Sequence, residues 1–331
     1  MKSYALKLRK ICGRIASKNY FSFPYALGRS ILALSLLVTI GCSDKYVLFP
    51  EHLYTHPDIV YYLKEFNLFF LFGYDGLWIS RLIACFLMVF VISGYYPRAS
   101  GILHWWVSLS FIHSSMLIDG GDQIVAVMTF LLVPITLLDN RVNHWQGAVT
   151  SGYKNFAAFC TFCLIELQVA VVYLQAGIEK PYRSEEWTDG TAFYYWINHN
   201  VFGTSDLVKS ILNPLLSYGS IVTLFTWGTI IFEVSLFGLI FMSRKRRAGL
   251  LKFALLFHFL IIIFHGLVSF FFAMAGALIL YLVPKEFNKK QFLCLIGWKQ
   301  RKSITTTAAD DNNGHFELEE NFPIPDTRVL L

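Results

Sequence analysis

The residues best suited to chemistry lie in one stretch, 168–195, which begins inside an apolar run and ends in a charged, aromatic loop. Gln168 and Gln175 are seven residues apart, so they share one face of a helix. Lys180 follows where the apolar run ends, and we expect Pro181 to stop the helix there. A lysine removed from water has a depressed pKa and can act as a base, whereas a lysine at a helix end can also serve only as an interfacial anchor. The stretch predicts a polar working edge centred on Lys180.

An aromatic loop follows this lysine and reads EEWTDGTAFYYWINHNVFG. Trp187 and Tyr194 are its candidate binding side chains. One interpretation places the loop in the membrane interface as an aromatic belt. The other makes it a lid over a cavity that accepts a peptide or an isoprenoid-like ring. The residues alone leave both interpretations open.

Two aspartates flank a tight turn, Asp119-Gly120-Gly121-Asp122, between two apolar segments. Asp and Gly favour turns, so both carboxylates have a structural explanation as caps of the turn. In the functional alternative Asp122, at the head of the following helix, faces a cavity between that helix and the one that carries Lys180. No histidine is near them in the sequence, so we expect no metal site.

Four more ionisable groups lie within apolar segments or at their ends: Glu166, Glu233, His258 and His265. A charged side chain inside a bilayer is costly unless it is paired or hydrated, so each is a candidate site residue. We place the two glutamates at a similar middle depth, where pairing with Gln, His or Arg between helices is the alternative to a functional role. For the two histidines the alternative is a hydrogen-bonded buried side chain. The candidate catalytic groups are Lys180, Asp119, Asp122 and His265, and the candidate groups for binding substrate or cofactor are Gln168, Gln175, Glu166, Glu233, His258, Trp187 and Tyr194.

The composition indicates a polytopic membrane protein. Of 331 residues, 55% are hydrophobic and 15% are charged, whereas about a quarter are charged in a typical soluble domain. The apolar residues come in blocks of about 17 to 25, long enough to cross a bilayer as helices. The net charge of +6 does not indicate nucleic-acid binding, because the basic residues flank the apolar blocks. The sequence has no nucleotide-binding, hydrolase or metalloprotease motif, so a nucleotide-driven pump or a hydrolase has no support.

Hydropathy predicts an all-α transmembrane helical bundle of about eight passes, with both termini in the cytoplasm. The last apolar region, residues 250–284, would reach about 52 Å as one helix, too long for a single pass. Basic residues follow it from Lys285 onward, which places this end inside. We therefore split the region near His265-Gly266. The predicted spans are residues 25–42, 78–95, 102–118, 124–138, 157–178, 219–242, and two between 250 and 284.

Three regions follow from this topology. Residues 1–24 form a basic cytoplasmic arm that anionic membrane lipid can hold. Residues 25–284 form the transmembrane domain. Residues 285–331 form a cytoplasmic basic segment followed by a disordered acidic tail.

The same topology brings scattered polar groups to one side of the membrane. Lys180, the Asp119–Asp122 turn and His265 all reach the outer face. Near the inner side, Arg29 lies one turn inside the first span, and we expect its side chain to snorkel to the interface. The sequence therefore predicts that a lysine, two aspartates and a histidine converge on the outer rim of one helix bundle.

Three segments together resemble a known family. They are DGGDQI at residues 119–124, QVAVVYLQAGIEKPYRSEEWTDGTAFYY at residues 168–195 and FHFLIIIFHGLVSFFFAM at residues 257–274. These segments are similar to the SdpB-like branch of the HTTM proteins, the bacterial relatives of the vitamin K-dependent gamma-carboxylase membrane domain. The resemblance covers roughly residues 25–284.

The resemblance implies a protein of the bacterial cytoplasmic membrane that helps to mature an exported antimicrobial peptide toxin. It implies two partners, a small SdpA-like protein and an exported peptide precursor. The carboxylase relatives use reduced vitamin K, oxygen and carbon dioxide with a lysine base, and Lys180 falls at the matching place in AGIEK. A carboxylase- or epoxidase-like enzyme with a reduced quinone or vitamin K-like cofactor is therefore one alternative. A non-catalytic immunity or export scaffold is another.

Overall fold

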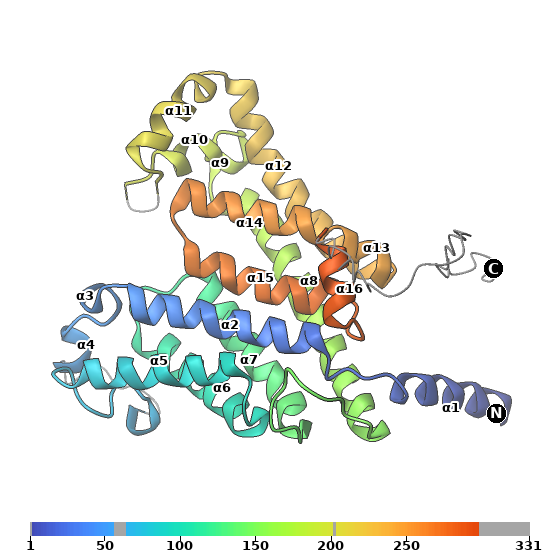
Figure 1. Ribbon diagram of the computed structural model, residues 1–331. Coiled ribbons are helices and arrows are strands. Elements are labelled where there is room, and N and C mark those ends of the chain that lie inside the picture. Colours follow the sequence, from blue (N-terminus) through green and yellow to red (C-terminus); the bar gives the residue numbers. More distant parts are fainter. Residues whose placement is uncertain (1, 56–63, 201–202, 298–331) are drawn as a thin grey trace, which may run out of the picture. The chain divides into compact units, whose positions relative to one another are not determined.

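A computed structural model describes residues 2–55, 64–200 and 203–297 (Figure 1), and the regular structure in these ranges is helical apart from one isolated β-bridge. The predicted all-α class is thus confirmed for them. The acidic tail and part of the aromatic stretch around residues 52–62 lie outside the described residues. In the first half the helices are α1 (Lys2–Ala16), α2 (Phe23–Cys42), α3 (Lys45–Leu48), α4 (His52–Thr55), η1 (Lys64–Phe66), α5 (Leu77–Ser93), α6 (Pro97–Ser114) and α7 (Gly120–Leu138). In the second half they are α8 (Gly152–Arg183), α9 (Glu185–Thr188), α10 (Ala192–Ile197), α11 (Asp206–Leu216), α12 (Gly219–Gly238), η2 (Leu239–Phe241), α13 (Arg244–Gly249), α14 (Leu251–His265), α15 (Val268–Leu282) and α16 (Lys289–Leu295).

Five helical segments of the described chain are long and apolar enough to cross a membrane. They are Phe23–Cys42, Gly120–Leu138, Gly152–Arg183, Gly219–Phe241 and Arg244–His265. Two shorter apolar helices, α5 and α15, match further predicted spans. The remaining predicted span, residues 102–118, overlaps α6. Each predicted span therefore coincides with a helix, and the number of crossings stays a prediction.

The last apolar region is divided where the sequence analysis placed its break. Helix α14 ends at His265 and α15 begins at Val268. Gly266 between them has φ = 69°, a left-handed conformation that glycine adopts without a steric penalty and that often caps a helix. Helices α14 and α15 then pack against each other as a hairpin (Figure 1).

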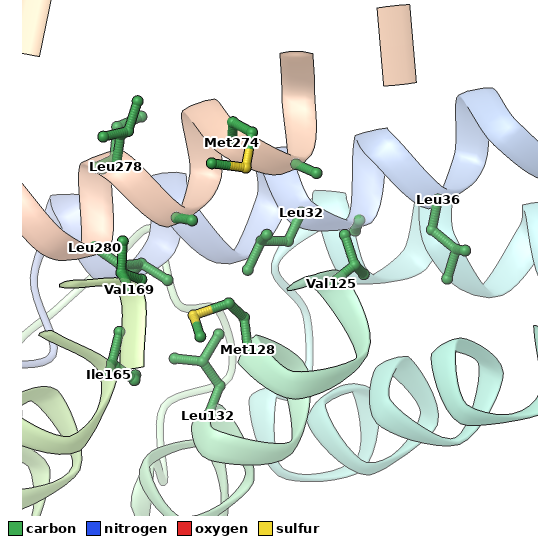
Figure 2. Packing of buried hydrophobic residues seen from close by; sticks show 14 of the residues in the cluster. Leu32, Leu36, Val125, Met128, Leu132, Ile165, Val169, Met274, Leu278 and Leu280 are labelled. Carbon is green, nitrogen blue, oxygen red and sulfur yellow. The ribbon is translucent and has the colours of Figure 1, made fainter. Parts of the chain in front are cut away.

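The core lies where α2, α7, α8 and α15 meet. Figure 2 shows apolar side chains from these four helices pointing toward one another, and they are Leu32, Leu36, Val125, Met128, Leu132, Ile165, Val169, Met274, Leu278 and Leu280. Helix α2 runs antiparallel to α15, because Gly28 lies against Gly276 and Leu280 while Ser35 Oγ donates to the Ser269 carbonyl at 2.8 Å. Glycine at this crossing lets the two backbones approach closely, as small residues do in membrane bundles.

Replacing Gly276 by alanine should destabilise this crossing. A Cβ there would lie 2.8 Å from Leu32 Cγ and 3.1 Å from the Gly28 carbonyl oxygen, so packed atoms would have to move. We expect a loss of about 1–3 kcal/mol in the free energy of unfolding, measured as a lower unfolding temperature in detergent. The matched control is Gly238→Ala, where a Cβ would meet nothing within 4 Å. Equal unfolding temperatures for the two variants would contradict this packing.

Arg29 does not snorkel, so that prediction was wrong. Its side chain is buried, and its guanidinium donates to Ser100 Oγ at 2.7 Å and to His144 Nδ1 at 2.9 Å. His144 accepts this bond as a neutral imidazole, and burial together with Arg29 and Arg141 lowers the pKa of His144 to about 2. The loop after α7 thus supplies a partner inside the protein, which removes the need to reach the membrane surface.

Candidate functional site

Lys180 on α8 and Glu233 on α12 form an ion pair. The Lys180 ammonium donates to Glu233 Oε2 and also to the Ala176 carbonyl at 3.1 Å. Only 19% of the lysine side chain and 12% of the glutamate side chain are exposed. The helices come this close because of Gly177, where a Cβ would lie 2.7 Å from Val234 Cγ2 and 3.3 Å from the Ile230 carbonyl. The sequence analysis selected both residues but did not pair them.

Pro181 does not stop the helix, contrary to the prediction. Helix α8 continues to Arg183 with Pro181 inside it. A proline removes one backbone donor, and local adjustment near a helix end can absorb that loss. Lys180 therefore belongs to the last helical turns of α8 and is held at a defined position beside α12.

A cavity of about 590 Å³ opens beside this ion pair. Both charged side chains line it, together with the end of α14 at His265. The Lys180 ammonium also lies 5.4 Å from the centre of the Trp187 ring, a favourable cation–π arrangement. Eight of the eighteen lining residues are Phe or Trp, and they are Trp187, Phe193, Trp196, Phe225, Phe232, Phe257, Phe264 and Phe270.

The aromatic loop predicted as either a belt or a lid packs over this cavity. The Phe193 ring stacks on Phe225 with centroids 4.8 Å apart, and the Phe193 backbone N–H donates to Thr226 Oγ1 at 3.0 Å. Trp196 meets His265 edge to face at 6.2 Å. Tyr194 is 45% exposed and is not part of the lining, whereas its neighbours Phe193 and Trp196 are.

Asp119 and Asp122 form the N-terminal cap of α7. Asp119 Oδ1 accepts the Asp122 N–H at 2.9 Å, and Asp122 Oδ2 accepts the Asp119 N–H at 3.1 Å. Burial raises the pKa of Asp119, against the opposing effect of its backbone hydrogen bonds. The turn lies behind the cavity wall, since a Cβ on Gly121 would be 3.0 Å from Phe270 Cα. Of the four groups predicted to converge, Lys180 and His265 line the cavity, while the two aspartates serve as a cap and stay a prediction as catalytic groups.

Glu166 lies far from the cavity and from Glu233. It precedes Lys180 by fourteen positions on α8, which corresponds to about 21 Å along a helix. Its carboxylate is surrounded by three cations: Arg247 Nη2 at 2.7 Å, Lys285 Nζ at 3.2 Å and Arg244 Nη2 at 3.8 Å. The predicted shared depth of the two glutamates is wrong, because Glu166 lies near the middle of α8 whereas Glu233 pairs with Lys180 close to the C-terminal end of that helix.

The free energy of unfolding should depend on pH between about 8 and 10.5 because of Lys285. Burial, together with Arg247, lowers the pKa of Lys285 from 10.5 to about 8 despite Glu166 nearby. Between these two values the unfolded chain binds more protons than the folded protein, so stability rises with pH. The rise should be on the order of 3 kcal/mol. Between pH 8 and 10.5, the unfolding temperature of the wild type should therefore increase relative to that of Lys285→Met. A difference between the two unfolding temperatures that stays constant over this range would contradict the prediction.

The other polar candidates lie outside the cavity lining. His258 is buried beside it, with Nδ1 2.8 Å from the Ala254 carbonyl and Nε2 3.4 Å from Tyr173 Oη, which matches the alternative of a hydrogen-bonded core histidine. Gln168 is half-buried and Gln175 is exposed. The two glutamines share a helix, but neither contributes to the cavity wall.

The sequence did contain a signal for the walls that we missed. Phe225, Thr229 and Phe232 follow the i, i+4, i+7 spacing of one helical face on α12, and Phe257, Ile261 and Phe264 repeat it on α14. Both helices face the same cavity. In a sequence, apolar residues at this spacing are normally explained by packing between helices. Only the structure shows that a cavity lies between these two faces.

Two proteins of Bacillus subtilis (strain 168) are similar to most of this chain. "Uncharacterized protein YitO" is 34% identical over 293 residues, which cover 84% of this chain and 90% of that protein. "Sporulation-delaying protein SdpB" is 35% identical over 292 residues, which cover 85% of this chain and 87% of that protein. The chain belongs to the SdpB family. No family model matches the chain. No solved structure matches it.

In this SdpB-family membrane protein, the cavity combines an apolar wall with one ion pair. Cavities of this kind bind ligands through apolar surface and use a few polar groups to fix orientation. Within the described residues, no group of three or more His, Cys, Asp or Glu side chains could hold a metal ion. The arrangement is therefore suited to binding an apolar ligand against a fixed donor and acceptor. The wider relationship to HTTM proteins stays an expectation.

Proposed function

We propose that this protein takes part in producing an exported antimicrobial peptide toxin and that it binds the peptide precursor in the cavity beside Lys180 and Glu233. The observation that carries the proposal is an ion pair on the wall of an aromatic cavity, in a chain related to a sporulation-delaying protein. A volume of this size fits a drug-sized ligand, which corresponds to a few apolar side chains of a peptide.

We also propose that the chain crosses a bacterial cytoplasmic membrane eight times, with both termini inside. Basic residues support this sidedness, because α1, the run Arg244–Arg247 on α13 and the lysines of α16 lie toward one end of the bundle (Figure 1). Positive charge favours the cytoplasmic side. The end of α14, which lines the cavity, lies toward the opposite end of the bundle (Figure 1), and this supports a position of the cavity near the outer face.

A small SdpA-like protein is the proposed partner, together with the precursor and membrane lipid. The family relationship supports this, since SdpB is named as a sporulation-delaying protein. The cavity supplies a place for the precursor, while the partner's contact face is not part of the proposal.

A second candidate function is a quinone-dependent carboxylase- or epoxidase-like reaction on the peptide. The observation in its favour is the aromatic cavity directly beside a lysine, which suits an apolar ring. Lys180 would then be the base, and its hydrogen bond to Glu233 would have to open before its nitrogen could reach the substrate.

The two candidates are separated by the mass of the mature peptide. Cells that carry the precursor should lose mature toxin when this protein is deleted, and a plasmid copy should restore it. A mature peptide explained by cleavage alone supports the first candidate, and an added carboxylate or oxygen supports the second. If deletion leaves toxin output unchanged and the protein only protects cells from added peptide, it is an immunity scaffold and both candidates fail.

A further inference from the structure

We infer that the cavity selects an uncharged, apolar peptide segment and that Lys180 and Glu233 together recognise one backbone amide of it. This inference rests on the proposed function and adds the chemical class of the bound segment. It follows from the charge balance of the ion pair and from the hydrogen-bonding groups that the pair leaves available.

The charge balance disfavours an ionic ligand. Lys180 and Glu233 neutralise each other, and each side chain is less than one-fifth exposed. A ligand carboxylate on the remaining N–H donor of Lys180 would lie beside the Glu233 carboxylate, and two like charges at a poorly exposed site repel each other. A ligand ammonium on Glu233 Oε1 would in the same way lie beside the Lys180 ammonium. A neutral ligand leaves the pair intact.

The hydrogen-bonding groups match an amide. A lysine ammonium has three N–H donors, and Lys180 uses two of them, on Glu233 Oε2 and the Ala176 carbonyl. Within the described residues Glu233 Oε1 accepts no hydrogen bond. One donor and one acceptor therefore stand side by side, and a peptide group offers the complementary C=O and N–H.

Other hydroxyl groups on the wall are already engaged. Thr226 Oγ1 accepts the Phe193 N–H at 3.0 Å, and Thr229 Oγ1 donates to the Phe225 carbonyl at 2.9 Å. The rest of the wall is largely aromatic and aliphatic. Apolar side chains of a ligand would therefore occupy the cavity while the ion pair fixes the main chain.

The test uses full-length protein in lipid nanodiscs and short peptides of alternating Phe and Leu. Three forms are compared: one acetylated and amidated at its ends, one with a free C-terminal carboxylate and one with a free N-terminal amine. Binding is measured by the fluorescence change of Trp187 and Trp196, and a Trp187→Phe/Trp196→Phe variant identifies the signal from the other tryptophans. The neutral peptide should bind about ten-fold more tightly than either charged form.

Two changes sharpen the test. Glu233→Gln leaves the Lys180 ammonium unpaired and should shift the preference to the carboxylate form, while Lys180→Met should shift it to the amine form.

A second experiment uses only the wild-type protein, so it does not depend on the variants folding. The backbone nitrogens of the neutral peptide are methylated one at a time, and methylation at a single position should weaken binding by about ten-fold.

The outcomes separate this inference from the proposed function. If none of the peptides binds the wild-type protein, the peptide-binding cavity itself is wrong. If neutral and charged peptides bind equally, or if no N-methyl position matters, the cavity binds peptides but the ion pair does not select them. Either of these latter results overturns the inference and leaves the proposed function standing.

Discussion

Replacing Lys180 by methionine should reduce toxin output about ten-fold or more while the protein still accumulates in the membrane. The change leaves Glu233, whose side chain is only 12% exposed, as an unpaired charge on the cavity wall. Removing one partner of a poorly exposed ion pair costs far more than losing an exposed one. Output is measured as growth inhibition by culture supernatant, normalised to the amount of protein in the membrane fraction.

The matched control lies on the next turn of the same helix. Arg183 pairs with Glu179 at 3.3 Å, but 71% and 45% of these two side chains are exposed. Such a surface pair contributes about 0–1 kcal/mol, so Arg183→Met should leave toxin output unchanged. Normal toxin output from a well-expressed Lys180→Met protein would show that toxin production does not require Lys180.

Replacing Glu166 by alanine should cause the largest loss of stability among single charge deletions in the described bundle. The change leaves Arg247 and Lys285, both essentially buried, facing each other without the carboxylate between them. Breaking a buried pair in this way costs about 3–5 kcal/mol. The unfolding temperature in detergent should fall markedly. The double variant Glu166→Gln/Lys285→Met should recover part of this loss, because it removes one of the two cations that are left without a carboxylate.

A second ion pair from the same end of the bundle serves as the comparison. Lys18 and Glu286 lie 2.9 Å apart with side chains 50% and 35% exposed. Glu286→Gln should therefore change stability by less than about 1 kcal/mol. Equal losses of stability in Glu166→Ala and Glu286→Gln would show that the buried group of Glu166, Arg247 and Lys285 does not stabilise the bundle as its burial indicates.

Much of the fold could be predicted because apolar length and turn chemistry are local signals. The break at His265-Gly266 followed from helix length and charge, and the structure places a left-handed glycine there. The cap at Asp119 and Asp122 was one of two stated alternatives. Two predictions made from local rules were wrong. Arg29 is held by Ser100 and His144, which are distant from it in the sequence. Pro181 lies close enough to the end of α8 for the helix to absorb the loss of one N–H donor.

The candidate site was less accessible to sequence reasoning. Lys180 and Glu233 are separated by 53 positions, and nothing local indicates that they meet. Their contact depends on Gly177, which lets α8 approach α12. Ionisable residues in apolar segments could be identified as costly, but which ones pair depends on helix order and depth. The sequence therefore identified Lys180, Glu233 and Glu166 as candidates. It missed the three cations around Glu166 and the separation of these residues into two groups.

The most direct test of the account asks whether the precursor occupies the cavity. A photo-reactive benzoyl-phenylalanine is placed at Phe193, which lines the cavity, or at Phe253, which is 62% exposed on α14. Cells that produce the precursor are then irradiated, and adducts are identified by mass spectrometry. We expect a covalent adduct with the precursor from position 193 and none from position 253. Equal adducts at both positions, or none at 193 in cells that still make the toxin, would contradict it.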